Sequence, residues 1–180
     1  MAAIRKIDKD SILDAAYNLV RKEGLGSLSA RKLAKAASCS TQPIYENFND
    51  MGMIIELTNK RVQEQVDLLK KSLKDREYAD YIKKGIATYK FANDERMLFR
   101  HFVMGDSADR ELFTNEQSVK MLMETEGCDE ETAKKIDKKM NDYILGNAFL
   151  LNSDYIQYDE NYLKEELEKY LQYVKANIAK

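Results

Sequence analysis

The sequence predicts an all-α protein, and three observations support this expectation. Glycine and proline, which interrupt helices, number only seven and one in 180 residues. Hydrophobic residues make up 44% of the chain and recur every three or four positions, the spacing of one helix face. Residues that cap helices, such as Asp8 and Ser29, stand directly before these segments. We expect an N-terminal three-helix domain over residues 1–50, continuous with a second helical domain over residues 51–180.

The first helix is expected over residues 9–23. Asp8 is its candidate N-cap, and Ile12 and Ala16 belong to a wide apolar face. Gly24 follows the last turn, where glycine readily adopts the left-handed conformation that ends a helix.

Two short helices follow, separated by a tight break. Ser29 can cap the first over residues 30–36, and the break begins at Ser38. Ser40 can cap the second, over residues 41–47.

The only proline, Pro43, falls in the first turn of that third helix, where a missing N–H group does no harm. Since Pro43 cannot donate, we expect the Ser40 hydroxyl to accept from the N–H group of Gln42. Asp50 is the candidate cap of a fourth helix. The later helices are expected at about residues 51–74, 78–92, 94–104, 111–126, 130–153 and 160–178.

The two short helices and their break are typical of a helix-turn-helix. A helix that enters the major groove needs hydrogen-bonding side chains outside and apolar anchors inside. Ile44 and Phe48, four residues apart, are the expected anchors, while Ser29 and Arg31 can reach phosphates. The side chains left for DNA on the third helix are Thr41, Gln42, Tyr45, Glu46 and Asn47.

The charge distribution agrees with a local contact to phosphate. Residues 1–61 contain ten basic and seven acidic residues, a net charge of +3, although the whole chain has a net charge of −2. The alternative is that the third helix belongs to an ordinary helical bundle without DNA contact, in which Ile44 and Phe48 are simply core residues.

The stretches SILDAAYNLVRKEG and LSARKLAKAASCSTQPIYENF resemble the DNA-binding domain of the tetracycline-repressor family. The resemblance covers a quarter to a third of the chain and implies a homodimeric regulator on a palindromic double-stranded DNA operator, with a C-terminal domain that binds a small-molecule effector. Carried over by position, the implied DNA-contacting residues are Ser29, Arg31, Ser40, Thr41, Gln42, Pro43 and Tyr45.

Two positions depart from the family pattern. Met51 stands where the family usually has a lysine that contacts a phosphate, and Gln42 replaces a frequent glycine. The resemblance therefore leaves one phosphate contact in doubt and implies an altered base preference.

Aromatic and methionine residues between positions 78 and 151 are first of all core, and their excess also suits an apolar effector pocket. The residues that we expect around such a pocket are Tyr89, Phe99, His101, Phe102, Phe113, Met121, Tyr143 and Asn147.

The last two helices have matching apolar stripes, which favour an antiparallel hairpin that pairs with its copy in a dimer. The alternative is that both stripes face the core of their own chain. The residues expected in the dimer interface are Ile136, Met140, Tyr143, Ile144, Leu163, Leu167, Leu171 and Val174.

Other classes find little support. Cys39, Cys128 and the single histidine, His101, have no metal-binding spacing, and no nucleophile–base pair or phosphate loop is visible, so we expect neither an enzyme nor a cofactor. No apolar run has the length of a membrane span and residues 1–10 lack a signal-peptide core, which favours a cytoplasmic protein without membrane contact. A helical ligand-binding or adaptor protein without DNA activity remains the rival hypothesis.

Overall fold

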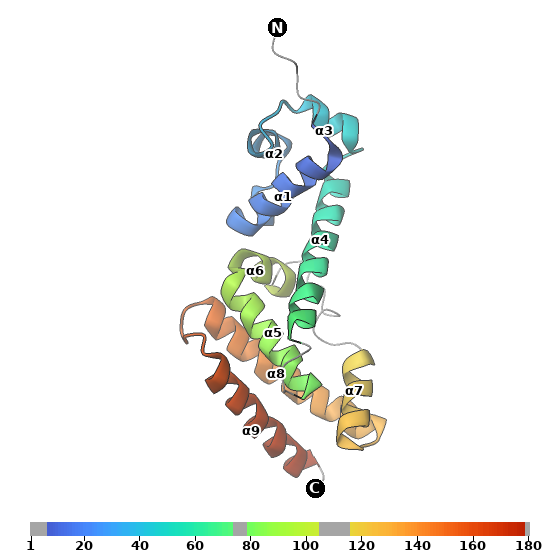
Figure 1. Ribbon diagram of the computed structural model, residues 1–180, viewed down its shortest axis with the longest axis vertical. Helices are drawn as coiled ribbons and strands as arrows, with labels where there is room; N and C mark the ends of the chain where they lie inside the picture. Colours follow the sequence, from blue (N-terminus) through green and yellow to red (C-terminus); the bar gives the residue numbers. More distant parts are fainter. Residues whose placement is uncertain (1–6, 74–78, 105–115, 179–180) are drawn as a thin grey trace. The chain divides into compact units, whose positions relative to one another are not determined.

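The computed structural model describes residues 7–73, 79–104 and 116–178, and within these ranges every regular element is helical (Figure 1). The all-α prediction is confirmed for this part of the chain. The elements are α1 (Lys9–Glu23), η1 (Leu25–Ser27), α2 (Ala30–Ala36), α3 (Gln42–Asn47), α4 (Met51–Ser72), α5 (Asp80–Asp94), α6 (Arg96–Met104), α7 (Glu116–Glu126), α8 (Glu130–Asn152) and α9 (Glu160–Ile178).

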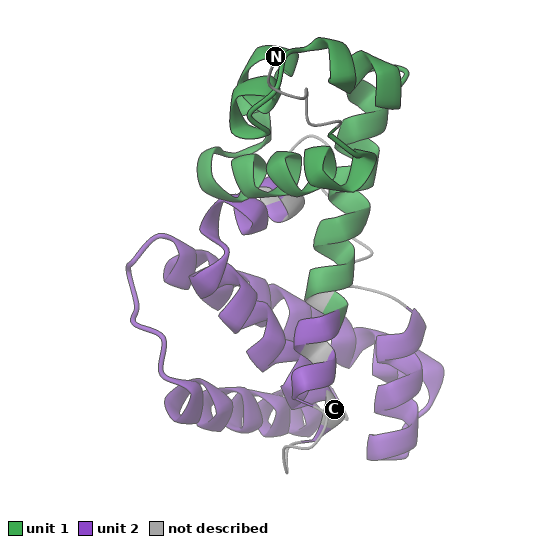
Figure 2. Ribbon diagram, turned by 45° about the horizontal axis from the view of Figure 1, so that its top comes forward, with its two compact units in different colours: residues 1–67 green, residues 68–180 purple. Residues whose placement is uncertain are grey.

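The chain gathers into two compact units, Met1–Asp67 and Leu68–Lys180 (Figure 2). The division falls inside α4, whereas the sequence suggested a boundary after residue 50. The first part of α4 belongs to unit 1 because Ile54 is buried in the core of that unit.

Local signals determine α1, which has the predicted bounds. The Asp8 carboxylate accepts from the Ser11 N–H group at 2.7 Å, and this bond lowers the pKa of Asp8. Gly24, with a φ of 81°, ends the helix in a backbone conformation that favours glycine.

The core of unit 1 joins its four α-helices. Side chains from each helix meet there, and Cys39 in the α2–α3 connection packs against them, half-buried. The buried members of the core are Ile12, Ala16, Leu33, Ala34, Ile44, Phe48 and Ile54.

The break between α2 and α3 lies where it was predicted. Ser29 caps α2 by accepting from the Lys32 N–H group at 3.4 Å, and Ser38 has a φ of 54°. The Cys39 N–H group donates to the Ala34 carbonyl at 2.9 Å and closes the turn.

The predicted cap of α3 is wrong. Thr41, not Ser40, is the N-cap residue, and no side chain forms a capping hydrogen bond. Thr41 already has helical dihedral angles, φ −72° and ψ −18°, and Pro43 in the first turn has no N–H group to satisfy. The first turn therefore forms without the Ser40 hydroxyl.

The start of α4 depends on Asp50, as predicted, because its carboxylate accepts from the Met53 N–H group at 2.8 Å. A Cβ atom added at Gly52 would lie 3.0 Å from the capping Asp50 oxygen. The glycine thus leaves room for the cap that starts the helix.

In unit 2, α5, α8 and α9 lie side by side, and α7 packs against α8 (Figure 1). The α8 helix is capped by Asp129, whose carboxylate accepts from the Thr132 N–H group at 2.8 Å. The predicted bounds of these helices agree with the structure to within about two residues at each described end, in line with the usual uncertainty of helix ends. Residues 111–115 of the predicted seventh helix lie outside the described residues.

Gly85 lets α5 approach α9 closely. A Cβ atom at this position would lie 2.6 Å from Leu167 Cδ1 and 3.3 Å from Ile144 Cδ1. Both neighbours are buried core residues, so neither has free space to move into.

Gly85→Ala is therefore expected to destabilise the protein by about 1–3 kcal/mol through overpacking, despite the better helix propensity of alanine. Gly146→Ala in α8 is the matched control, since a Cβ atom there meets nothing within 4 Å. Urea unfolding of both variants measures the difference. A Gly85→Ala variant as stable as Gly146→Ala would contradict the close approach.

Among the described residues, no helix is both long and apolar enough to cross a membrane.

Candidate nucleic-acid interface

The α3 helix has an anchored inner side and a polar outer side. Ile44 and Phe48 are buried in the core of unit 1, whereas Tyr45 is 58% exposed. The other predicted contact residues divide by exposure: Ser29, Arg31, Ser40 and Gln42 are exposed, and Thr41, Pro43 and Asn47 are half-buried. The buried and exposed sides of α3 are thus those that the spacing of Ile44 and Phe48 predicts.

Two side chains of α3 form hydrogen bonds within the helix. Gln42 Nε2 donates to Glu46 Oε1 at 2.8 Å, and both side chains are exposed. Asn47 Nδ2 donates to the Pro43 carbonyl at 2.7 Å. The amide of Gln42 is therefore at the surface and oriented by Glu46, while the Asn47 amide is already used by its own helix.

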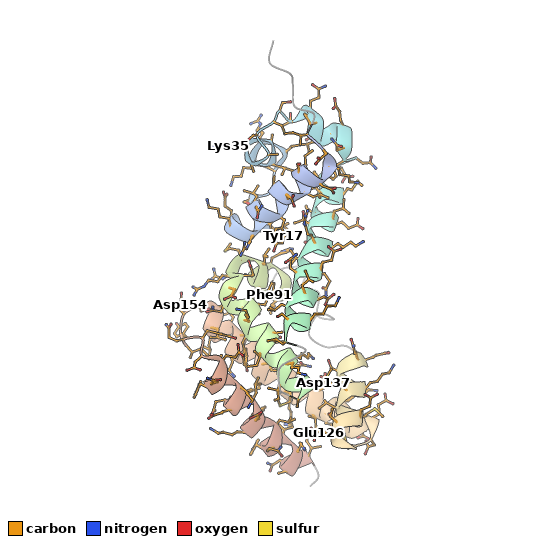
Figure 3. The ribbon with its side chains drawn as sticks, viewed as in Figure 1. Tyr17, Lys35, Phe91, Glu126, Asp137 and Asp154 are labelled. Atoms are coloured by element: carbon orange, nitrogen blue, oxygen red, sulfur yellow. The ribbon has the colours of Figure 1, made fainter. Side chains whose placement is uncertain are left out.

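The α2 helix of the same unit carries exposed cations. Arg31 and Lys35, one helical turn apart and so on the same face, form no salt bridge with any described residue. Figure 3 labels Lys35 on α2. Lys32 differs, because its ammonium group lies 2.9 Å from the Glu23 carboxylate and lowers the pKa of that group.

Unit 1 thus presents hydrogen-bonding side chains and unpaired cations on two short, anchored helices. The chain matches no model of a known protein family and no curated protein.

Of the residues expected around an effector pocket, two are fully buried and the other four that the structure describes are half-buried. Tyr89 and Phe99 are fully buried, and the Phe99 ring meets the Phe91 ring edge-on, with 6.2 Å between the centroids. Figure 3 labels Phe91. His101 is half-buried, and burial lowers its pKa. Met121 is half-buried on α7. The Phe102 side chain and Phe113 lie outside the described residues.

The structure brings three of these residues together. Asn147 Nδ2 donates to the Tyr143 carbonyl at 3.0 Å. Burial raises the pKa of Tyr89, with a further contribution from Tyr143 and an opposing hydrogen bond from Asn147. The Tyr143 ring itself stacks on Tyr170, with centroids 4.1 Å apart. These aromatic residues form packed contacts within unit 2.

A cavity of about 540 Å³ lies instead between α7 and α8. It is lined by Glu116, Val119, Lys120, Met123, Glu130, Lys134 and Asp137, and none of the six predicted pocket residues whose side chains the structure describes is among them. The lining residues recur at helical spacing on both helices, and this spacing can be seen in the sequence. The empty space between them depends on how the helices pack, which the spacing does not determine. No group of three or more potential metal ligands occurs among the described residues.

The residues predicted in a dimer interface are covered by their own chain. Seven of them are buried within unit 2 and only Tyr143 is half-buried. The prediction is corrected accordingly, because the apolar stripes of α8 and α9 face each other and α5. The buried residues are Ile136, Met140, Ile144, Leu163, Leu167, Leu171 and Val174.

The same two helices also carry exposed apolar side chains, which we call the outer stripe. It contains Leu150 of α8, which is 38% exposed, and Tyr162 and Tyr173 of α9, which are 59% and 63% exposed. Phe149 is also exposed. In α9, these tyrosines stand one position before the buried Leu163 and Val174, so a search for apolar pairs at neighbouring positions could have found this outer stripe.

Proposed function

We propose that the protein is a transcriptional regulator that binds operator DNA through a helix-turn-helix formed by α2 and α3, and that it acts as a repressor. The observation that supports this proposal is the division of α3, with Ile44 and Phe48 in the core and Gln42, Tyr45 and Glu46 at the surface. A helix held from inside and polar outside has the character that major-groove contact requires. The resemblance of these residues to the tetracycline-repressor family agrees with it.

In this proposal the outward side chains have separate roles. Thr41 and Gln42 contact bases, and a glutamine amide pairs best with adenine because it can donate to N7 and accept from N6. Glu46, which orients Gln42 in the free protein, accepts from a cytosine amino group once the two side chains separate. Ser29, Arg31 and Tyr45 bind phosphates and set the register of the helix.

The regulator acts as a homodimer, in which each copy binds one half of a palindromic operator. The outer stripe of α8 and α9, defined by Leu150, Tyr162 and Tyr173, supports this arrangement because exposed apolar surface of this kind marks interaction sites. A small-molecule effector bound in unit 2 releases the DNA by favouring a conformation that does not fit it.

Arg31→Ala tests the phosphate contact. Each phosphate that a cation neutralises contributes close to one unit to the slope of log K against log salt concentration. We therefore expect Arg31→Ala in a dimer to weaken binding to all DNA sequences and to lower the magnitude of this slope by about two. Titrations of labelled DNA at several salt concentrations measure both effects.

Lys138→Ala is the matched control, because it also removes one exposed cation, but from α8 and not from the proposed DNA-binding helices. It should leave the slope nearly unchanged. An unchanged slope for Arg31→Ala would contradict the role of α2, and absence of DNA binding by the wild-type protein would favour a helical ligand-binding or adaptor protein.

A further inference from the structure

The cavity between α7 and α8 combines apolar walls with one deep polar group. Val119 and Met123 of α7 form apolar parts of the wall, and Asp137 of α8 is the buried charged residue that lines it. The volume of about 540 Å³ is within the range of sites that hold small organic molecules. The cavity is therefore large enough for a ligand with an apolar body.

Asp137 is held in place by a polar network from three helices. The Tyr81 hydroxyl donates to Asp137 Oδ1 at 2.8 Å, and Asn141 Nδ2 donates to Asp137 Oδ2 at 2.7 Å. Lys84 Nζ lies 3.6 Å from Asp137 Oδ1 and donates to Ser118 and Asn141. Figure 3 labels Asp137 on α8. This carboxylate is preorganised, because its neighbours fix its position before any ligand arrives.

The charges around the cavity favour a cation. Lys84, which pairs with Asp137 at 3.6 Å, is not part of the lining, so the buried charged residue among the lining residues is the acidic Asp137. At the rim, the Lys134 ammonium group lies 2.6 Å from the Glu130 carboxylate and is compensated by it. The remaining rim charges, Glu116 and Lys120, are exposed to solvent, which weakens their effect.

Burial decides which of these charges matters most. An anion placed against a buried carboxylate meets repulsion in a low dielectric, whereas a cation gains a charge-assisted hydrogen bond there. Among the described residues, Asp137 Oδ2 accepts from one donor, Asn141 Nδ2, and a carboxylate oxygen can accept two hydrogen bonds. A protonated amine fits this free acceptor position.

We propose that this cavity binds a small organic cation, a protonated amine on an apolar body, with the ammonium group on Asp137. We further propose that the amine is the effector of the regulator, and this role rests on the proposed function above. Binding itself does not depend on DNA.

Three probes with the same apolar body test the charge preference: 4-phenylbutylamine, 4-phenylbutanol and 4-phenylbutanoate. Calorimetric titration of the full chain should show the amine binding about tenfold or more tighter than the alcohol, because the alcohol is a neutral donor whereas the ammonium group adds an opposite charge beside the buried carboxylate. The carboxylate should bind weakest. Equal binding of amine and carboxylate, or no binding of the amine at millimolar concentration, would overturn the proposal.

Two variants locate the site. Asp137→Asn should remove the preference for the amine over the alcohol. Because this change leaves Lys84 without its partner and could unfold the protein, Met123→Trp provides an independent test by filling the cavity. Met97→Trp is the matched control, since Met97 is also half-buried in unit 2 and does not line the cavity. Amine binding should be lost in Met123→Trp and retained in Met97→Trp, and retention in both would overturn the assignment.

The role as effector is tested separately. Amine that binds the wild-type protein should release it from its DNA, and Met123→Trp should bind the same DNA without responding to the amine. If the amine binds but the protein binds no DNA, the proposed function fails while the cavity assignment stands. If the protein binds DNA but not the amine, the cavity assignment fails alone.

Discussion

Replacing Leu150 with glutamate is expected to convert the proposed dimer into a monomer. It should also weaken the proposed operator binding about a hundredfold, because linking two binding contacts raises the affinity by at least about that factor. Leu150 lies in the outer stripe of α8 and α9 and is partly exposed in the single chain. In a symmetric dimer that buries this stripe, two new carboxylates would lose water without gaining partners. Folding of each chain should be unaffected, because the position is at the surface.

Light scattering measures the mass of the variant, and DNA titration measures its affinity. Gln172→Glu is the matched control, since it adds the same charge to α9 at an exposed residue. Gln172 precedes Tyr173 and lies about 100° around the helix from it, outside the residues that define the outer stripe. A Leu150→Glu protein that keeps the mass of a wild-type dimer would show that the outer stripe is not the interface.

Lys84→Met is expected to destabilise the protein by about 3–5 kcal/mol, because breaking a buried ion pair leaves an uncompensated charge. The Lys84 and Asp137 side chains are only 13% and 9% exposed. Lys84 also donates to Ser118 and Asn141, so one change removes the partner of a carboxylate and two further hydrogen bonds. Urea unfolding of the purified chain measures the loss.

Two further variants separate the charge effect from a loss of packing. Lys90→Met on the same helix breaks an exposed pair with Asp94 at 2.7 Å and should cost less than about 1 kcal/mol. Lys84→Met combined with Asp137→Asn should recover much of the lost stability, because Asn141 can rotate its amide and accept from the introduced one. A double variant as unstable as Lys84→Met would contradict the ionic explanation.

The sequence predicted those features of the fold that depend on neighbouring residues. Asp8, Ser29 and Asp50 each accept from the N–H group three positions later, and a local rule of this kind needs no tertiary information. The cap at Ser40 failed because the backbone at Thr41 is already helical, which depends on the turn before it. The division of α3 into inner and outer sides followed from its four-residue spacing.

Features that depend on packing between distant segments could not be predicted in this way. The stripe containing Met140 and Leu167 was assigned to a second chain, but α5 of the same chain covers it, with Gly85 allowing the close approach. The sequence does not distinguish aromatic residues that fill a core, such as Phe99, from aromatic residues that surround a cavity. The polar network around Asp137 joins residues that are distant in the sequence, such as Lys84 and Asp137, which are 53 positions apart, and no short motif indicates it.

Selection of DNA from a pool of random duplexes by the wild-type protein tests the central claim, contact between the outer side of α3 and DNA, most directly. The account predicts enrichment of a palindrome whose half-sites lie about 34 Å apart or a multiple of it. It also predicts that Gln42→Ala changes the preferred bases within each half-site. Recovery of no common sequence, or of the same sequence by the Gln42→Ala variant with equal preference, would contradict it.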